Sequence, residues 1–426
     1  MGADPRLMEL PVPILQERIA SGAMRAADLA AAAAAKVEAA DGDGLAWFDG
    51  DYLRRQGAGM DVWRGRGRPL GALHGLPVTV GDLADTARIP TRLGTAVHDA
   101  RVPERDAALV ERLRGAGALI AGKGVVSPFG TGGSDGAATP VAARYAPAAV
   151  ITSADGGAIA EAAARGVVGY RPTAGSIPMR GVFAAAPTLA TATVLATDLV
   201  GAASVAEALF APGDDAAFAM PAPPPGLKAA TAATPPVPPT IAVVPPLWWD
   251  DADADIVAAF EELAEALTPR AFGATLPEIF HEATTQAHRI IAAESAKTLH
   301  GTVERHGDDL PAGVAALVAA GEGVSARDYL TALDWRTVLA AGLDAVLDRC
   351  DAVLTAVSPR VGEAGPADAN LTWAFLGVPS VTLPLLGSED GRAIGLQLIS
   401  RKGDDARLLR TAAWLQALVV RQGESN

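Results

Sequence analysis

Residues 132–173 read GGSDGAATPVAARYAPAAVITSADGGAIAEAAARGVVGYRPT and decide the fold of this chain. A loop of small residues at 132–134 leads into an alanine-rich helical run and then into a short apolar strand around 150–151. A second glycine turn, at 155–157, starts another helix. Backbone N–H groups converge where a helix begins, and some hydrolases present a serine and its oxyanion hole on such a pair of loops.

Strand and helix patterns alternate outside this stretch as well. Residues 71–80 and 118–123 are short apolar runs, and a helix at 107–115 with apolar residues at helical spacing lies between them. A strand–helix–strand order of this kind predicts an α/β sheet. The further predictions are strands at 240–244, 351–355, 380–384 and 393–399, helices at 12–40, 253–267, 277–300, 326–348 and 404–420, and a polar segment at 41–70.

Motifs along nearly the whole chain carry a resemblance to one family. They are Leu73-His-Gly-Leu-Pro77, Glu104-Arg-Asp-Ala107, Gly122-Lys123, Gly166-Val-Val-Gly169 with Arg171-Pro-Thr173, and Gly395-Leu-Gln-Leu398. Together with residues 132–173 they resemble the amidase signature family, serine hydrolases that cleave carboxamides with a Ser–cis-Ser–Lys triad. The resemblance implies an α/β fold in which helices sandwich a mixed, twisted central sheet. It also implies one domain over residues 1–426, with an N-terminal helical segment at 1–60 and a Pro-rich surface excursion at 212–246.

Most positions that carry the chemistry in that family are changed here. The family's first loop, Gly-Gly-Ser-Ser, supplies the bridging serine, and this chain keeps it as Ser134. The second loop, Thr-Asp-x-Gly-Gly-Ser, supplies the nucleophile 24 residues later, but the matching residue here is Ala158. The lysine of the family's Val-x-Val-Lys-Asp strand end is replaced by Gly81. A methyl group and a hydrogen can neither attack a carbonyl nor accept a proton, so the resemblance implies that amide hydrolysis is lost.

Six residues remain as candidates for ligand binding or altered chemistry: Ser134, Asp135, Asp155, Gly156, Gly157 and Lys123. Of five lysines, Lys123 is the one expected near the site, although its family counterpart is usually structural. Ser134 is either a loop serine bonded to its own backbone or a displaced nucleophile. Asp155 either caps the helix after it or opposes the negative charge of an oxyanion. Asp135 and Asp155 together are an alternative acid/base pair or cation site.

The connection at 124–132 is shorter than in the family, where a long loop helps to wall the substrate pocket. We therefore expect a pocket that is either more open or rebuilt from other segments. Without a triad there is less reason to keep a strained cis peptide at Ser134, and the sequence leaves its geometry open.

The composition of the chain limits the partners, the compartment and the cofactors that we expect. The net charge of −14 disfavours nucleic acid and anionic membranes. The single cysteine, Cys350, excludes an internal disulfide, and with an N-terminus unlike a signal peptide it predicts a cytoplasmic protein. The six histidines lack metal-ligand spacing, and the glycine-rich runs match neither a phosphate loop nor a dinucleotide fingerprint, so we predict no metal and no cofactor.

Three hypotheses follow. The first is a pseudo-amidase that does not hydrolyse amides and acts as a binding or scaffold subunit, as a homodimer or in a heteromer with another enzyme subunit, with a small amide or carboxylate as candidate ligand. The second is an enzyme, a hydrolase or acyl-transfer enzyme acting on the carbon–nitrogen bond of a small amide or ureide, with chemistry rewired through Ser134, Asp135, Asp155 or Lys123. The third is a shifted register in which Ser153 or Ser176 is the nucleophile.

Overall fold

Small apolar residues build the centre of the molecule. In the computed structural model, which describes residues 4–98, 101–133, 136–211, 226–366 and 368–423, every residue of strand β4 (Ala148–Ser153) is buried. Helix α6 (Gly157–Ala164) follows it directly, and each of its residues up to Ala163 is buried too. This matches the strand and helix predicted around residues 150 and 160.

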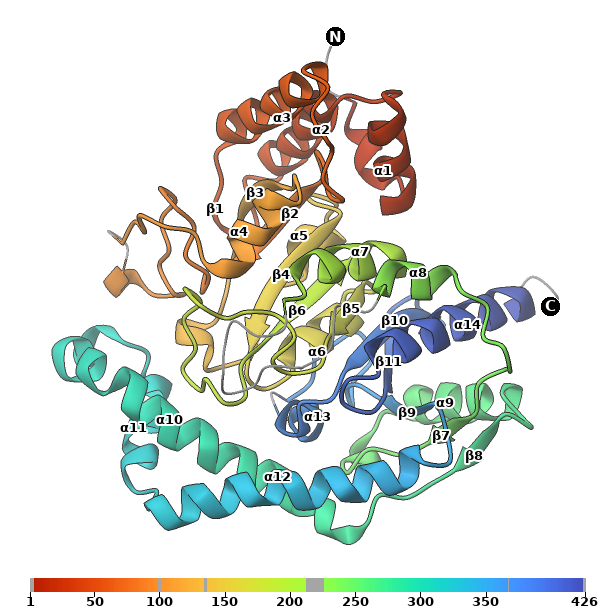
Figure 1. Ribbon diagram of the computed structural model, residues 1–426. Coiled ribbons are helices and arrows are strands. Elements are labelled where there is room, and N and C mark those ends of the chain that lie inside the picture. Colours follow the sequence, from red (N-terminus) through yellow and green to blue (C-terminus); the bar gives the residue numbers. More distant parts are fainter. Residues whose placement is uncertain (1–3, 99–100, 134–135, 212–225, 367, 424–426) are drawn as a thin grey trace.

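The described residues form one mixed sheet of eleven strands, ordered β1-β3-β2-β4-β6-β5-β10-β11-β9-β7-β8 (Figure 1). Strands β2 and β4 run parallel, as do β7 and β9, whereas β4, β6, β5, β10, β11 and β9 pair in antiparallel fashion. Helices flank this sheet, so the predicted α/β class with a mixed sheet is confirmed. The strands other than β4 are β1 Leu45–Trp47, β2 Pro77–Gly81, β3 Leu119–Gly124, β5 Val168–Arg171, β6 Thr191–Ala196, β7 Ile241–Val243, β8 Ala271–Gly273, β9 Ala352–Ala356, β10 Ser380–Gly387 and β11 Ala393–Ile399.

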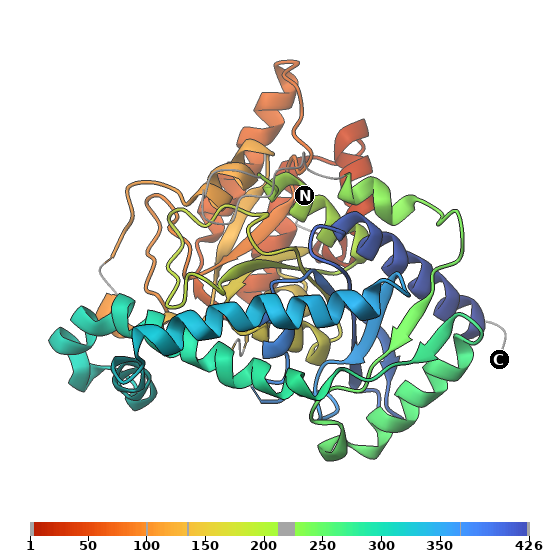
Figure 2. The same cartoon turned by 60° about the horizontal axis from the view of Figure 1, so that its bottom comes forward.

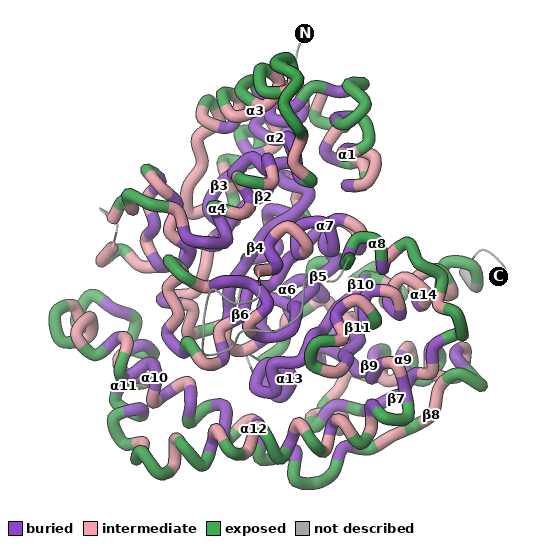
Figure 3. The backbone as a smooth tube through the Cα atoms, viewed as in Figure 1, coloured by how far each residue is buried: buried purple, intermediate pink, exposed green. Residues whose placement is uncertain are grey.

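The helices cover the sheet and extend beyond it. Helices α10, α11 and α12 form an arm along one side of the molecule, and α12 runs across the front in Figure 2. Figure 3 shows how α6 is buried while α12 stays largely accessible. The helices other than α6 are α1 Val12–Ser21, α2 Ala26–Ala39, α3 Gly50–Gly65, α4 Ala108–Gly115, α5 Thr139–Ala142, α7 Leu199–Leu209, α8 Leu227–Ala232, α9 Ala254–Ala266, α10 Glu282–His306, α11 Ala312–Glu322, α12 Ala326–Leu347, α13 Leu371–Leu376 and α14 Asp405–Gly423.

Helix α6 approaches the sheet so closely that glycine is required opposite it. A Cβ atom at Gly169 of β5 would lie 2.8 Å from Cβ of Ala162, and one at Gly395 of β11 would lie 2.6 Å from Cβ of Ala163. Such separations are far below van der Waals contact, so small residues on both sides set the distance between helix and sheet.

The C-terminal helix is tied to the sheet by a buried carboxylate. Asp405, the first residue of α14, accepts hydrogen bonds from the Tyr170 hydroxyl (2.6 Å), the Thr173 N–H (2.9 Å) and the Thr173 hydroxyl (2.5 Å). Burial raises the pKa of Asp405, and these hydrogen bonds oppose the rise. The Arg-Pro-Thr motif therefore serves as an anchor for α14.

Two segments differ from the sequence predictions. The polar segment predicted at 41–70 contains the edge strand β1 and the helix α3, which packs on α2 through Gly57, where a Cβ would lie 2.6 Å from Cβ of Ala30. The polarity of α3 hid this helix, because few of its residues are buried. In the predicted excursion at 212–246, α8 packs against α14 and buries Leu227, whereas the strand predicted at 240–244 is confirmed as β7. Residues 212–225 lie outside the described residues.

A substitution tests the close approach of α6. Gly395→Ala should destabilise the protein by about 1–3 kcal/mol, because the new methyl group overlaps Ala163. The measurement is denaturant unfolding, with Gly387→Ala in β10 as the control, since a Cβ there makes its nearest contact at an ordinary 3.5 Å. In an Ala163→Gly background the same substitution should cost less. Equal costs in both backgrounds would show that the two residues do not interact.

Candidate functional site

Gly81, the predicted counterpart of the family's catalytic lysine, ends strand β2 next to two apolar side chains and a carbonyl group. A Cβ atom built on it would lie 3.5 Å from Cδ1 of Ile151, 3.6 Å from Cγ1 of Val126 and 3.6 Å from the Val150 carbonyl oxygen. The adjacent Gly124 of β3 is covered by the same Ile151 atom, at 3.7 Å from its own Cβ position. A longer side chain at position 81 would therefore have to extend past Ile151 and Val126.

Ala158, the counterpart of the nucleophile, is completely buried near the start of α6. It belongs to a buried apolar cluster that also contains Ile151, Ala137 and Ala138. Ile151 thus reaches the Gly81 position and shares one cluster with Ala158. Apolar packing surrounds the two positions that lack reactive groups.

The glycine turn before α6 keeps its backbone shape. Gly156 has a φ of 81°, a left-handed conformation that favours glycine, and a Cβ there would also crowd Asn370 at 3.2 Å. The N–H of Gly157 is 2.9 Å from Oδ1 of Asp155, which accepts its hydrogen bond. Burial raises the pKa of Asp155, and the Gly157 N–H opposes that rise. The chain's own carboxylate therefore occupies one donor of the turn that would otherwise face an oxyanion.

Just after the candidate residues Ser134 and Asp135, a buried glutamate that sequence reasoning missed binds the backbone. Ser134 and Asp135 lie outside the described residues, so their proposed roles stay predictions. Just beyond them, the Gly136 N–H donates to Oε1 of Glu161 at 3.0 Å, and Glu161 is buried within α6. From sequence, a glutamate in an alanine-rich helix is expected to be exposed to solvent. The buried position of Glu161 becomes visible only in the tertiary fold.

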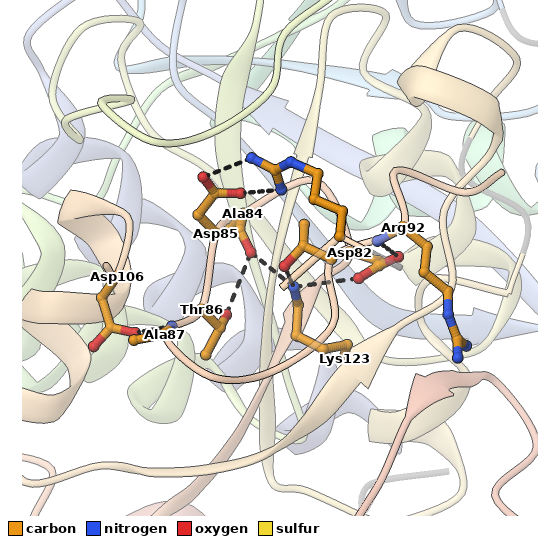
Figure 4. Close-up of polar contacts among 10 residues, drawn as sticks. Asp82, Ala84, Asp85, Thr86, Ala87, Arg92, Asp106 and Lys123 are labelled. Carbon is orange, nitrogen blue, oxygen red and sulfur yellow. Dashed lines mark hydrogen bonds and ion pairs between the residues drawn. The ribbon is translucent and has the colours of Figure 1, made fainter. Parts of the chain in front are cut away.

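Lys123 lies deep in the structure and is surrounded by oxygen atoms (Figure 4). Its Nζ donates to the Ala84 carbonyl at 2.7 Å and the Thr91 hydroxyl at 3.0 Å, and it pairs with Oδ1 of Asp82 at 3.2 Å. Burial lowers the pKa of Lys123, and the Asp82 charge opposes this shift. All three donors of the ammonium group are used, and the side chain has no solvent exposure. Lys123 therefore holds the segment that follows β2 and is poorly placed to act as a base.

The hollow beside these loops is narrow. It has a volume of about 20 Å³, roughly enough for one water molecule. Its walls include Phe129 and Phe183, whose ring centroids are 5.6 Å apart, and Ser153 at the end of β4. Phe129, Gly130 and Thr131 of the short connection at 124–132 also line it, and whether the pocket is more open or rebuilt stays a prediction.

The alternative serines have no base beside them. Ser153 and Ser176 are both buried, and neither hydroxyl has a hydrogen-bond partner among the described residues. A serine nucleophile needs a base within hydrogen-bond reach. The structure therefore gives no support to a register in which either serine attacks a substrate.

A model of the amidase family matches residues 30–135 and 131–409. The chain belongs to the amidase signature family. A glutamyl-tRNA(Gln) amidotransferase subunit from Streptomyces coelicolor is 25% identical over 97% of this chain and 97% of its own length. The corresponding protein of Anaeromyxobacter sp. is 27% identical over 93% of this chain and 94% of its own length.

Solved structures of amidase-fold proteins superpose closely. A chain of a vestigial protein complex, described as revealing the evolutionary origins of an s-triazine catabolic enzyme, has a TM-score of 0.88 at 23% identity, covering 96% of this chain and 98% of that one. An amidase has a TM-score of 0.83 at 25% identity, covering 96% of this chain and 99% of that one. At 23% identity, the likeness to the chain of the vestigial complex shows the shared fold alone.

The described residues also bear on metal binding and on membrane insertion. No cluster of three or more histidine, cysteine, aspartate or glutamate side chains there is arranged to hold a metal ion. None of the helices in the same ranges has both the length and the apolar character needed to cross a bilayer.

The structural role of Lys123 can be tested by removing its charge. Lys123→Met should destabilise the protein by about 3–5 kcal/mol, because it leaves Asp82 buried and uncompensated. Lys123→Met/Asp82→Asn should recover much of that loss, since the amide oxygen can still accept from the Arg92 N–H. Denaturant unfolding measures both, with Lys36→Met, which breaks a half-exposed pair with Glu9, as the near-neutral control. A Lys123→Met protein as stable as its parent would contradict this role.

Restoring the two lost side chains should not restore chemistry. Gly81→Lys/Ala158→Ser places a lysine against Ile151 and Val126 and leaves the Gly157 N–H engaged by Asp155, so we expect no amide hydrolysis and reduced stability. Ala158→Ser alone should fold normally and resist a fluorophosphonate probe, because it lacks a base. The measurements are benzamide turnover, probe labelling and thermal unfolding. Turnover by the double variant would show that the site remains competent.

Proposed function

We propose that this protein is an amidase-signature protein without amide hydrolysis, which serves as a non-catalytic subunit in an assembly with another enzyme. The observation that carries the proposal is that Gly81 and Ala158 replace both reactive groups, with Ile151 packed at the first position and clustered with the second. Loss of a single triad member already removes most of the acceleration of a serine hydrolase. The engaged Gly157 N–H is a further obstacle to stabilising an oxyanion.

The relatives support the subunit role. The chain matches glutamyl-tRNA(Gln) amidotransferase proteins over nearly its whole length, and the name of those proteins states that they are subunits. One structural neighbour comes from a vestigial protein complex. We therefore favour a heteromer over a homodimer. A cytoplasmic location is part of the proposal, since the chain has a single cysteine, Cys350, and its side chain is buried.

Two measurements test this proposal. The purified chain should show no turnover of benzamide or other simple amides and no labelling by a fluorophosphonate probe. An affinity-tagged chain isolated from its own host should form a stoichiometric complex with another enzyme subunit, identified by native mass spectrometry, and its removal should lower that enzyme's activity.

Each outcome has a distinct reading. Hydrolysis at rates typical of working amidases would overturn the loss of catalysis. Turnover that disappears in Ser134→Ala would instead favour an enzyme with rewired chemistry. A native mass of two identical chains would replace the heteromer with a homodimer, and a monomer that binds no other enzyme subunit would overturn the scaffold role.

A further inference from the structure

A second, wider hollow lies on the arm formed by α10 and α12. It has a volume of about 560 Å³, within the range of pockets that hold small molecules in proteins. Its walls come from α10, from the start of α12 and from the loop at 187–188. The neighbouring residues Ala185 and Ala186 of the same loop line the narrow hollow instead. The two spaces thus lie along one loop and are lined by different residues.

Hydrogen bonds make the walls of the wide hollow rigid. The carboxylate of Glu294, a buried residue of α10, accepts from the Thr188 N–H at 2.9 Å and from the Thr188 hydroxyl. The Tyr329 hydroxyl of α12 donates to Oε1 of the same carboxylate at 2.6 Å. The Thr298 hydroxyl donates to the Ala185 carbonyl at 2.8 Å. The loop, α10 and α12 are therefore joined before any ligand arrives, which lowers the entropy cost of binding.

One charged group on the wall remains unused. Glu294 spends three of its acceptor sites on the walls, and the Ser325 hydroxyl is engaged by Asp328 at 2.6 Å. Lys297 lies one turn beyond Glu294 on α10 and is exposed to solvent, and its ammonium group has no hydrogen bond or ion pair among the described residues. An ammonium group offers three hydrogen-bond donors and no acceptor, so Lys297 gives the hollow a positively charged donor for a ligand.

The surrounding charges favour an anion as well. Burial lowers the pKa of Arg336 on α12, and the nearby Glu294 carboxylate opposes that shift, so the two opposite charges act on each other. The Glu294 carboxylate is thus held by three hydrogen bonds and also interacts with the positive charge of Arg336. The next acidic group beside the hollow, Asp328, accepts a hydrogen bond from the Ser325 hydroxyl at 2.6 Å. The charge of Lys297 is left without an offset of this kind.

We propose that this hollow, the α10–α12 pocket, binds a small organic carboxylate whose charged end pairs with Lys297. Part of the wall is apolar, from Pro187, Ala293 and Val324. These surfaces match a short hydrocarbon body and offer nothing to the outer oxygens of phosphate or sulfate. The proposal goes beyond the non-catalytic function above and does not depend on it, because binding at Lys297 and amide hydrolysis are measured separately.

Binding of hexanoate to the full chain, followed by isothermal titration calorimetry, tests the proposal. Wild-type protein should bind it saturably, and Lys297→Met should bind at least about tenfold more weakly, the loss of one charge-assisted hydrogen bond. Lys228→Met is the matched control and should leave binding unchanged, since Lys228 lies on α8 in another hollow, where it donates to Gln16 at 2.8 Å. Ala293→Trp should block binding by filling the pocket while Lys297 stays in place.

Three comparisons decide between this ligand class and others. Affinity for hexanoate should fall as sodium chloride is added, because salt screens an accessible ion pair. Equal affinity of wild type and Lys297→Met, or no saturable binding at all, would overturn the proposal. Preference for hexylammonium over hexanoate would assign recognition to Glu294 instead. Displacement of hexanoate by an equal concentration of sulfate would show a general anion site, contrary to a pocket shaped for organic acids.

Discussion

The close approach of helix α6 to the central sheet is the constraint on which the rest of the structure depends. Gly169 and Gly395 leave no room for side chains opposite Ala162 and Ala163, and the helix is buried along most of its length. Only small residues can line such a contact, which explains why the stretch from 157 to 164 consists of glycine and alanine apart from Ile159 and Glu161. Ala158 lies within this helix, which begins directly after Gly156 of the glycine turn. The requirement for small residues belongs to the fold and persists whether or not the chemistry does.

Loss of the reactive groups and the apolar packing around them are physically linked. An amine at position 81 would need hydrogen-bond acceptors or water around it, since an unpaired buried charge is strongly unfavourable. Ile151 and Val126 provide neither, and they suit a site where glycine is present. On the other side of the turn, Asp155 satisfies the Gly157 N–H that would otherwise be left for a substrate. These contacts fit the glycine and the alanine that are present at positions 81 and 158.

The sequence predicted the features that depend on local pattern. The α/β class, the strands β4, β9 and β11 and the long helices α10, α12 and α14 follow from apolar periodicity, and the changed residues at 81 and 158 follow from motif spacing. What escaped prediction depends on contacts between distant segments. Glu161 became a buried anchor because a loop some 25 residues earlier folds over it. Helix α3 was missed because it covers α2 with only a few buried residues. The α10–α12 pocket is built from three segments that no single motif connects.

The ends of the neighbouring strands β2 and β3 differ in whether they carry a lysine. Strands β2 and β3 run parallel, with Gly81 opposite Gly124 and Val80 opposite Lys123. At position 123 three oxygen atoms surround the amine, so the charge is compensated and the segment after β2 is held in place. At position 81 the nearest described groups are the side chains of Ile151 and Val126 and the Val150 carbonyl oxygen, and the residue is glycine. The fold thus keeps Lys123, whose amine supports the structure, and has glycine at position 81, where the family resemblance implies a catalytic lysine. The same contrast separates Lys123, which is enclosed by oxygen atoms, from Lys297 of α10, which lines the α10–α12 pocket and is exposed to solvent.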